Sequence, residues 1–422
     1  MLSREETSEI LNGYNHGKIS ILTACSHSFL PMAFGARQEG IRIIGATLKD
    51  GGPDYHQAFP HGQADEYLKL NSYMDLIEDD KVVKYLQDNN VIAYGNGSLV
   101  QYMKGENDTI TRFEDIPIPV LGNRKILKIE ASRESQRQLL EKAGLNIPKV
   151  IHDPHKLSPD YPGILKLDGA TGGRGFRIVQ NHEEYIEAIE EQQVMYPGSV
   201  PTLQEYIRGV RMYPQYYYSP LVQEGCPAGE GTIELMGIDV RRETNIDEDY
   251  KAPQEQGKRT FVVVGNYETV IRESLLGEIM DSGRKVVDAS MEYGGIIGAF
   301  GLEGVENDTP EFRPFEFTGR VMAGTTASAN SGSIYSSMRW RPPRSFARKV
   351  GMSAQYLARW GTAFYWPKEM STYRRMMFEV NLARKPLRKK KRMENFAKII
   401  TWFLTVIYLK MRSWLREEIK DG

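Results

Sequence analysis

Two acidic residues late in the chain are the best candidates for metal chemistry. Glu303 in "FGLEGV" and Glu316 in "PFEFTGR" each interrupt an apolar run that reads as a β-strand. The segment between them, "ENDTPE", is rich in turn formers, so we expect a hairpin with both carboxylates on one face. A carboxylate among apolar neighbours is costly unless it is paired or metal-bound. Two such groups suit Mg²⁺ held together with phosphate oxygens; the alternative is a pair of buried salt bridges, for instance with Arg320.

A lysine followed by closely spaced glycines supplies a second candidate. The segment "GILKLDGATGGRGFRIV" places Lys166 at the end of an apolar run, just before Gly172, Gly173 and Gly175. The spacing matches neither a GxxxxGK[ST] phosphate loop nor a GxGxxG dinucleotide turn. A lysine in this position can supply positive charge to phosphates, and the glycines would let a hairpin close over them. An ordinary hairpin whose lysine reaches solvent is the alternative.

A third candidate lies in "TLQEYIRG", where Glu205 is followed by Tyr206 and Ile207. Backbone groups of such a segment can recognise adenine while the carboxylate holds a ribose. Taken alone the pattern is weak, because a sheet strand with one exposed acid explains it better. Its place in the chain adds to it: a strand lysine, a glycine hairpin, this hinge and two late strand carboxylates follow one another in the order typical of ATP-grasp enzymes.

Alternating strands and helices are expected to build the first part of the chain. The strands "ISILTA" and "IRIIGAT" flank the helix "FLPMAFGARQEG", and another helix and strand follow at 80–95. This alternation predicts an open parallel sheet, and ligands of such sheets bind at the carboxyl ends of the strands. Two loops occupy that place, 25–28 with His27 and 95–98 with Ser98.

The rest of the chain is rich in antiparallel strand patterns before it turns helical and basic. We therefore expect an α/β protein with the ATP-grasp fold. An N-terminal parallel-sheet domain that binds substrate would span 1–124. The ATP-grasp small subdomain with the glycine lid would span 125–200, and the large subdomain with the metal site 201–345. A helical, basic extension would span 346–422.

The formal net charge of −1 combines a basic end with an acidic remainder. Residues 384–422 hold 12 lysines and arginines against 4 acids, a net +8, so the remainder carries −9. An acidic body argues against nucleic-acid binding, and a basic end suggests a separate role for that segment. The cysteines, Cys25 and Cys226, form no disulfide framework, and the charged N-terminus lacks a secretory signal, so we expect a cytoplasmic protein.

Apolar residues recur with helical spacing between Phe396 and Leu415, just after the basic run "RKPLRKKKR". The uninterrupted run within this stretch is too short for a membrane-spanning helix. Two explanations remain open. The segment packs on the body or on another subunit, or it lies at a membrane surface to which the basic residues draw it.

The stretch from about Lys18 to Ser337 resembles the archaeal PurP family of ATP-grasp ligases. The matching segments are "SHS", "GNGS", "LKLDGATGGRGF", "QEYIRGV", "YYYSP", "VVVGN", "RESLL", "LEGV" and "FEFTGRVMAGT". Family members use ATP to activate formate as formyl phosphate. They transfer the formyl group to 5-aminoimidazole-4-carboxamide ribonucleotide (AICAR), which gives 5-formaminoimidazole-4-carboxamide ribonucleotide (FAICAR) in IMP and purine biosynthesis. The resemblance also implies Mg²⁺ or Mn²⁺ as cofactor and closed homo-oligomers.

The resemblance further implies a role for each candidate residue. His27, Ser98 and Asn266 match residues that contact the aminoimidazole nucleotide. The expected ATP-binding residues are Lys166, Gly172, Gly173, Gly175, Glu205, Tyr206, Ile207 and Glu243. The expected metal ligands are Glu303 and Glu316, and the expected catalytic residues are His27, Lys166, Glu303 and Glu316. From the residues alone, His27 is equally well a turn residue bonded to the backbone, and Ser98 a helix N-cap.

Two other functions fit the same residues. An ATP-grasp ligase could join a different acid to a different amine. A regulator that binds a nucleotide without turnover is the second possibility, although the presence of Lys166, Glu303 and Glu316 argues against it. Turnover of ATP with formate, with and without AICAR, would separate these functions.

Overall fold

The computed structural model describes most of the chain before residue 361. The described residues are 2, 4–26, 28–49, 54–103, 111–166, 176–195, 201–220, 226–229, 231–243, 263–328, 332–339 and 345–360. His27, the glycines Gly172, Gly173 and Gly175, and the basic segment 384–422 therefore lie outside the described residues. Within the described ranges, no helix is both long and apolar enough to cross a membrane.

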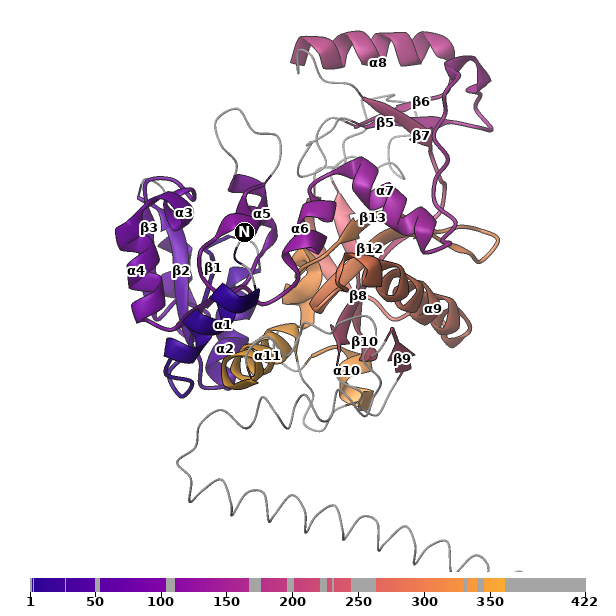
Figure 1. Cartoon of the computed structure of the whole chain (residues 1–422). Coiled ribbons are helices and arrows are strands. Elements are labelled where there is room, and N and C mark those ends of the chain that lie inside the picture. Colours follow the sequence, from indigo (N-terminus) through magenta and orange to yellow (C-terminus); the bar gives the residue numbers. More distant parts are fainter. Residues whose placement is uncertain are drawn as a thin grey trace, which may run out of the picture. The chain divides into compact units, whose positions relative to one another are not determined.

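The first part of the chain forms the expected parallel sheet (Figure 1), with strand order β3-β2-β1-β4. Its strands are β1 (Ser20–Ala24), β2 (Arg42–Leu48), β3 (Glu66–Leu70) and β4 (Val91–Ala93). Its helices are α1 (Arg4–Gly13), α2 (Phe29–Gln38), α3 (Asp75–Glu78), α4 (Asp80–Asp88) and α5 (Gly97–Tyr102). The sequence did not suggest β3, because its charged and half-buried residues lack the apolar run of β1 and β2.

A small antiparallel sheet follows, with strand order β6-β5-β7. The chain enters it through α6 (Arg124–Glu130) and α7 (Arg133–Lys142), and α8 (His182–Met195) packs against it. The strands are β5 (Gly163–Lys166), β6 (Phe176–Val179) and β7 (Thr202–Glu205). Lys166 is therefore the last residue of its strand, as expected for a lysine that precedes the glycine segment.

A larger antiparallel sheet carries the late carboxylates, with strand order β11-β10-β8-β12-β13 and β9 paired to β10. Its strands are β8 (Val210–Ser219), β9 (Cys226–Ala228), β10 (Gly231–Glu243), β11 (Val263–Glu268), β12 (Gly298–Glu306) and β13 (Phe312–Thr318). Short 3₁₀ helices connect elements at η1 (Asp54–Ala58), η2 (Phe113–Asp115), η3 (Pro154–Lys156), η4 (Met291–Tyr293) and η5 (Ala323–Ser328).

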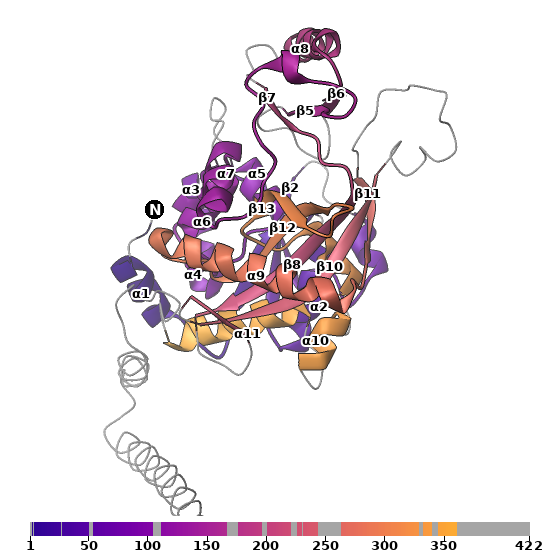
Figure 2. The same ribbon diagram turned by 90° about the vertical axis from the view of Figure 1, so that its right-hand side faces the viewer.

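The two faces of the large sheet have different neighbours, because successive side chains of a strand point to opposite sides. Tyr216 and Phe300 join an apolar core with α7 and α9 (Glu273–Ser290), and Figure 2 shows α9 lying across the strands β8 and β10. Tyr217 and Ala299 face the other way and share a core with α2. The charged side chains of the candidate site, including Glu303, lie on this second face.

The described part of the C-terminal extension belongs to this second core. It consists of α11 (Phe346–Trp360), preceded by α10 (Ile334–Arg339). Ala347, Val350 and Ala354 are buried in the core that contains α2. Lys349 adds a buried ion pair with Glu234 of β10, with 2.7 Å between Nζ and Oε1.

The close contact between α2 and α11 predicts a stability effect. A Cβ atom on Gly35 would lie 2.3 Å from the Cβ of Ala347 and 2.7 Å from that residue's backbone. Gly35→Ala should therefore push α11 away and destabilise the fold by about 1–3 kcal/mol, the usual cost of overpacking. Gly277→Ala in α9 is the matched control, because no atom lies within 4 Å of its added methyl group. Urea unfolding followed by circular dichroism measures both, and an unchanged midpoint for Gly35→Ala would contradict the packing argument.

Candidate active site

Glu303 and Glu316 face each other across the β12–β13 hairpin. The two residues are direct partners in the antiparallel register, beside an irregularity between Glu303 and Gly304. The expected hairpin with both acids on one face is therefore confirmed. The alternative of salt bridges is also borne out in part, because Glu303 forms a buried ion pair with Arg241. Its suggested partner Arg320 is wrong, because Arg320 binds Glu130 instead, with 2.9 Å between Nη2 and Oε1.

Glu303 is almost fully buried and is held by an arginine. Its carboxylate accepts two hydrogen bonds from the guanidinium group of Arg241, one of 2.8 Å between Nη1 and Oε2. The guanidinium carbon also lies 4.3 Å from the ring centre of Tyr213. Burial raises the pKa of Glu303, and the nearby Glu316 adds to this, while Arg241 opposes it. Glu303 is thus a carboxylate that needs a neighbouring positive charge.

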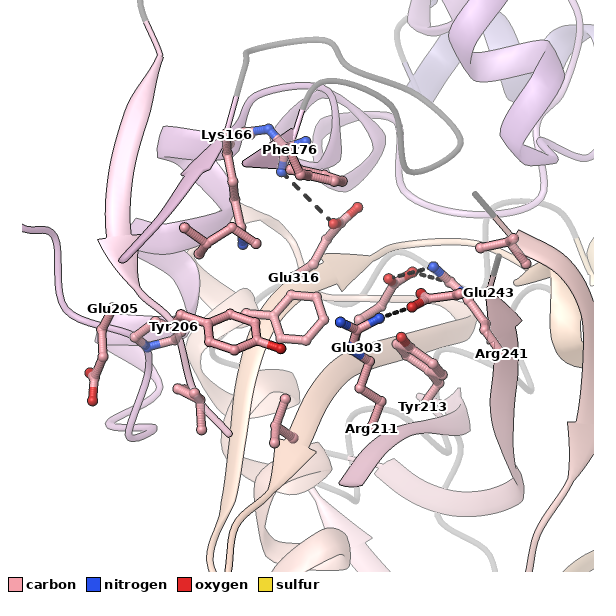
Figure 3. A pocket seen from close by; sticks show the side chains of 17 residues that line it. Lys166, Phe176, Glu205, Tyr206, Arg211, Tyr213, Arg241, Glu243, Glu303 and Glu316 are labelled. Atoms are coloured by element: carbon pink, nitrogen blue, oxygen red, sulfur yellow. Dashed lines mark hydrogen bonds and ion pairs between the residues drawn. The ribbon is translucent and has the colours of Figure 1, made fainter. Parts of the chain in front are cut away.

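Lys166 reaches the same region from the small sheet (Figure 3). Its side chain is 7% exposed, and its Nζ lies 4.8 Å from the ring centre of Phe315. Burial, helped by Arg133, lowers the pKa of Lys166 to about 8, and Glu316 and Glu303 partly oppose this. Arg133, at the start of α7, also lies 3.9 Å from Glu316, measured from Nη1 to Oε2. Two cations and two carboxylates therefore meet where the sheets approach each other.

These side chains line one cavity that is open to solvent. Seven of the site residues expected from the sequence line the cavity: Lys166, Glu205, Tyr206, Ile207, Glu243, Glu303 and Glu316. It also contains Arg133, Pro148, Ile164, Phe176, Arg211, Tyr213, Arg241, Val263, Val305 and Phe315. Residues that lie far apart in the sequence are thus brought together in one place.

Glu205 and Tyr206 of the hinge segment lie at the far side of the cavity from Arg241 in Figure 3. The Glu205 carboxylate accepts hydrogen bonds from Arg313, 3.0 Å from Nη1 and 2.8 Å from Nη2. These bonds hold the pKa of Glu205 below its usual value. The Glu205 carboxylate, which we expect to contact a ribose, is therefore already bound by Arg313. The ribose contact stays a prediction. Glu243, at the end of β10, forms an ion pair with Arg211.

Ser98 and Asn266 do not appear among the described residues that line this cavity. Ser98 lies inside α5, whose N-cap is Asn96: the Asn96 side chain accepts a hydrogen bond of 2.9 Å from the Leu99 N–H. The alternative of Ser98 as an N-cap is therefore wrong. Asn266 lies on β11, where its Nδ2 donates a 2.8 Å hydrogen bond to Oδ2 of the buried Asp239.

Well-defined contacts surround the turn that contains His27, although His27 itself is outside the described residues. Asn96 donates from Nδ2 to the hydroxyl of Ser26 over 3.2 Å and to the carbonyl of Ala24 over 2.9 Å. Ser28 adopts a left-handed conformation with φ of 68°, and its hydroxyl donates to the Met322 carbonyl over 3.1 Å. The first strand-to-helix turn is thereby tied both to the loop before α5 and to the segment between β13 and η5.

The two facing carboxylates fit a divalent cation only when other oxygen ligands join them. The described residues contain no group of three acidic, histidine or cysteine side chains placed to hold a metal ion. Mg²⁺ usually binds one or two carboxylates and completes its octahedron with water and substrate phosphates. Glu303 and Glu316 could supply these two carboxylates. Glu303 is buried, and Glu316 is half-buried at the cavity surface, where substrate phosphates could join it.

The sequence did not point to the arginines of the cavity or to its aromatic residues other than Tyr206. For Arg241 a signal was available, because in "IDVRRE" it precedes Glu243 by two residues and shares its strand face. For Arg133 there was none, since a first-turn helix arginine is common on protein surfaces. Its approach to Glu316 depends on where the helix packs.

Comparisons with known proteins give matches over most of the chain. A family model described as a protein of unknown function (DUF1246) matches residues 21–151, and one described as a domain of unknown function (DUF1297) matches residues 182–361. A 5-formaminoimidazole-4-carboxamide-1-(beta)-D-ribofuranosyl 5'-monophosphate synthetase of Methanothrix thermoacetophila is 38% identical over 346 residues, which cover 80% of this chain and 92% of that protein.

Solved structures support the same architecture. The IMP biosynthesis protein PurP of Thermococcus kodakaraensis superposes with a TM-score of 0.59 at 23% identity, covering 80% of this chain and 96% of that one. A biotin carboxylase in complex with β-γ-ATP from Campylobacter jejuni superposes with a TM-score of 0.54 at 14% identity, covering 81% of this chain and 72% of that one. These similarities confirm the expected α/β ATP-grasp fold with an N-terminal parallel sheet.

Proposed function

The chain belongs to the family of 5-formaminoimidazole-4-carboxamide ribonucleotide synthetases, and we propose that it makes FAICAR from AICAR, formate and ATP. The similarity covers 92% of a relative that is named as such a synthetase. The observation that carries the proposal is the convergence of Lys166, Glu303, Glu316 and the hinge 205–207 on one cavity. The chain therefore acts as an ATP-grasp carbon–nitrogen ligase in IMP biosynthesis.

We infer one orientation for ATP in the cavity. The apolar and aromatic hinge residues Tyr206 and Ile207 would contact the adenine at one end. The phosphates would lie between Lys166 and the facing carboxylates at the other end, where Arg133 adds positive charge. Catalysis of phosphoryl transfer is mainly positioning and charge neutralisation, and these residues supply both.

The reaction proceeds through two substitutions. A formate oxygen attacks the γ-phosphorus, the bond to the β-phosphate oxygen breaks, and ADP leaves with formyl phosphate remaining. The 5-amino nitrogen of AICAR then attacks the formyl carbon, inorganic phosphate leaves, and the nitrogen loses a proton. Holding the amine beside the acyl phosphate supplies roughly 7–11 kcal/mol of the barrier reduction by avoiding a bimolecular encounter. No side-chain nucleophile is required.

Glu303 and Glu316 would hold the divalent cation, Mg²⁺ or Mn²⁺, together with phosphate oxygens. When bound, such a cation neutralises phosphate charge during transfer. His27, Ser98 and Asn266 are proposed to contact AICAR, and Gly172, Gly173 and Gly175 to cover the phosphates. Self-association of the chain and a contact of the segment 384–422 with a membrane surface or another subunit also remain proposals.

Turnover by the purified full-length protein tests the function. ATP, Mg²⁺ and formate are supplied with and without AICAR, and FAICAR and ADP are measured by mass spectrometry. FAICAR that appears only when formate and AICAR are both present supports the proposal. ADP released with another acid or amine would point to a ligase of different specificity. Tight ATP binding without any turnover would point to a regulator.

The lowered pKa of Lys166 predicts the alkaline limb of the pH profile. Because the ammonium form binds phosphates, its charge is lost as the pH rises through about 8. The kcat/KM for ATP reports the free enzyme, so it should fall about tenfold for each pH unit above that value. Lys166→Arg keeps its charge throughout this range and should flatten the limb. The same fall in both proteins would assign it to another group.

A further inference from the structure

Arg241 lies between the metal carboxylates and the proposed acceptor site. On one side its guanidinium group makes two hydrogen bonds to Glu303. On the other, its strand β10 pairs with β11 so that Arg241 is the direct register partner of Asn266. Directly opposite residues of an antiparallel pair project to one face, with Cβ atoms about 5 Å apart. With the metal on Glu303 and Glu316 and the acceptor at Asn266, as proposed above, the acid substrate would occupy this interval, because its oxygen must reach the γ-phosphate and its carbon the amine.

The geometry points to Arg241 as the residue that binds the formate carboxylate. This inference rests on the function proposed above and adds to it the recognition of the acid substrate. Formate has no side chain, so its two oxygens are its only directional feature. A planar guanidinium group matches two carboxylate oxygens with parallel hydrogen bonds, which a lysine ammonium cannot do.

The Glu303 contact shows that this guanidinium group is already arranged for a carboxylate. The guanidinium carbon also lies over the Tyr213 ring, 4.3 Å from the ring centre, which supports the group from a second side. A divalent cation on Glu303 and Glu316 would compete with Arg241 for the same carboxylate oxygens. If those oxygens bound the cation instead, the two N–H groups that now donate to Glu303 would be available to a second carboxylate.

The other cations of the cavity are placed for different partners. Lys166 ends β5 immediately before the glycine segment and offers a point charge. Arg133 approaches Glu316 from α7 on the side of Phe176, 5.6 Å from that ring centre. Arg211 holds Glu243 at the end of β10. Of the described cationic residues that line the cavity, Arg241 is the one paired in register with Asn266.

A comparison of Michaelis constants in Arg241→Lys tests the inference. The variant keeps the positive charge but loses the fork, so the KM for formate should rise about 10- to 100-fold, the usual value of one charge-assisted hydrogen bond. The KM for ATP should stay within about threefold, because the proposed contact of Arg241 is with formate and not with the nucleotide. An unchanged KM for formate would overturn the inference. Equal increases in both constants would overturn it too, because Arg241 would then serve the nucleotide.

Arg348→Lys is the matched control. Arg348 also binds a glutamate, with 2.6 Å between its Nε and Oε1 of Glu39, and its side chain is 22% exposed against 20% for Arg241. It lies in α11 and is not among the described residues that line the cavity. Its replacement should leave both Michaelis constants at the wild-type values.

Chemical labelling of the wild-type protein keeps the inference testable even where Arg241→Lys does not fold. The full-length protein is treated with phenylglyoxal in the presence of Mg²⁺ and a non-hydrolysable ATP analogue, and labelled arginines are located by mass spectrometry. Formate should lower labelling of Arg241 several-fold and leave Arg348 unaffected. Labelling of Arg241 that ignores formate overturns the inference.

The outcomes separate this inference from the proposed function. A wild-type protein that makes FAICAR from formate, combined with negative results for Arg241, would leave the function standing and overturn the role of Arg241 alone. A wild-type protein that makes no FAICAR from formate would overturn both.

Discussion

Replacing Glu316 by glutamine is expected to abolish ADP formation while the protein stays folded. The substitution removes one of the two facing carboxylates and so the charge that holds the cation on the phosphates. Loss of one such electrostatic contact in a preorganised site usually lowers kcat by roughly 100- to 1000-fold. Formate-dependent ADP release, measured by a coupled assay at saturating ATP, gives the result.

The fold should tolerate this change because Glu316 contributes little to stability. Its side chain is 32% exposed, and its ion pair with Arg133 spans 3.9 Å. Pairs of this kind contribute about 0–1 kcal/mol, so the free energy of unfolding should change by no more than that. Glu187→Gln on the exposed side of α8 is the control for the chemical change itself. Normal turnover by Glu316→Gln would exclude Glu316 from the metal site.

Replacing Lys166 by methionine should have the second large effect, and it should move activity and stability in different directions. The ammonium group is buried and desolvated, which lowers its pKa to about 8. Methionine retains a flexible apolar side chain of similar length and avoids burying a charge, so stability should be unchanged or higher. The rate of ADP formation should fall by roughly 100- to 1000-fold, because a phosphate contact made in the transition state is lost.

Thermal unfolding and steady-state kinetics on the same sample measure both effects. Lys125→Met on the exposed surface of α6 is the control, and it should change neither quantity. A Lys166→Met protein that unfolds at much lower temperature would show that Lys166 supports the fold. Unimpaired turnover would remove it from the phosphate site.

Much of the fold could be predicted because hydrophobic periodicity depends on neighbouring residues. The parallel order of β1 and β2 around α2 follows from two apolar runs that flank a helix pattern. The hairpin that opposes Glu303 to Glu316 follows from the turn formers between them. In contrast, β3 is half-buried and charged, so it lacks the signal that identifies a strand.

The side-chain partners of the site could not be predicted, because they depend on packing between distant segments. Arg241 and Glu303 are 62 residues apart, and Glu205 and Arg313 are 108 apart. The sequence indicated Glu303 as a metal ligand and Glu205 as an ATP-binding residue. It did not indicate that each carboxylate is bound by an arginine from a distant strand. Ser98 shows that local contacts can also be mispredicted. Two nearby polar residues could each cap α5, and the structure has Asn96 as the N-cap.

The embedding of α11 also determines where a shortened version of this protein remains viable. A premature stop before residue 345 would strip Ala347, Val350 and Ala354 from the core that they share with α2. It would also leave Glu234 without its buried lysine partner. Such a truncated protein would expose the apolar surface of this core, and we expect proteases to degrade it. A stop after residue 360 would spare these contacts, so only cuts beyond that point can reveal what the basic end of the chain does.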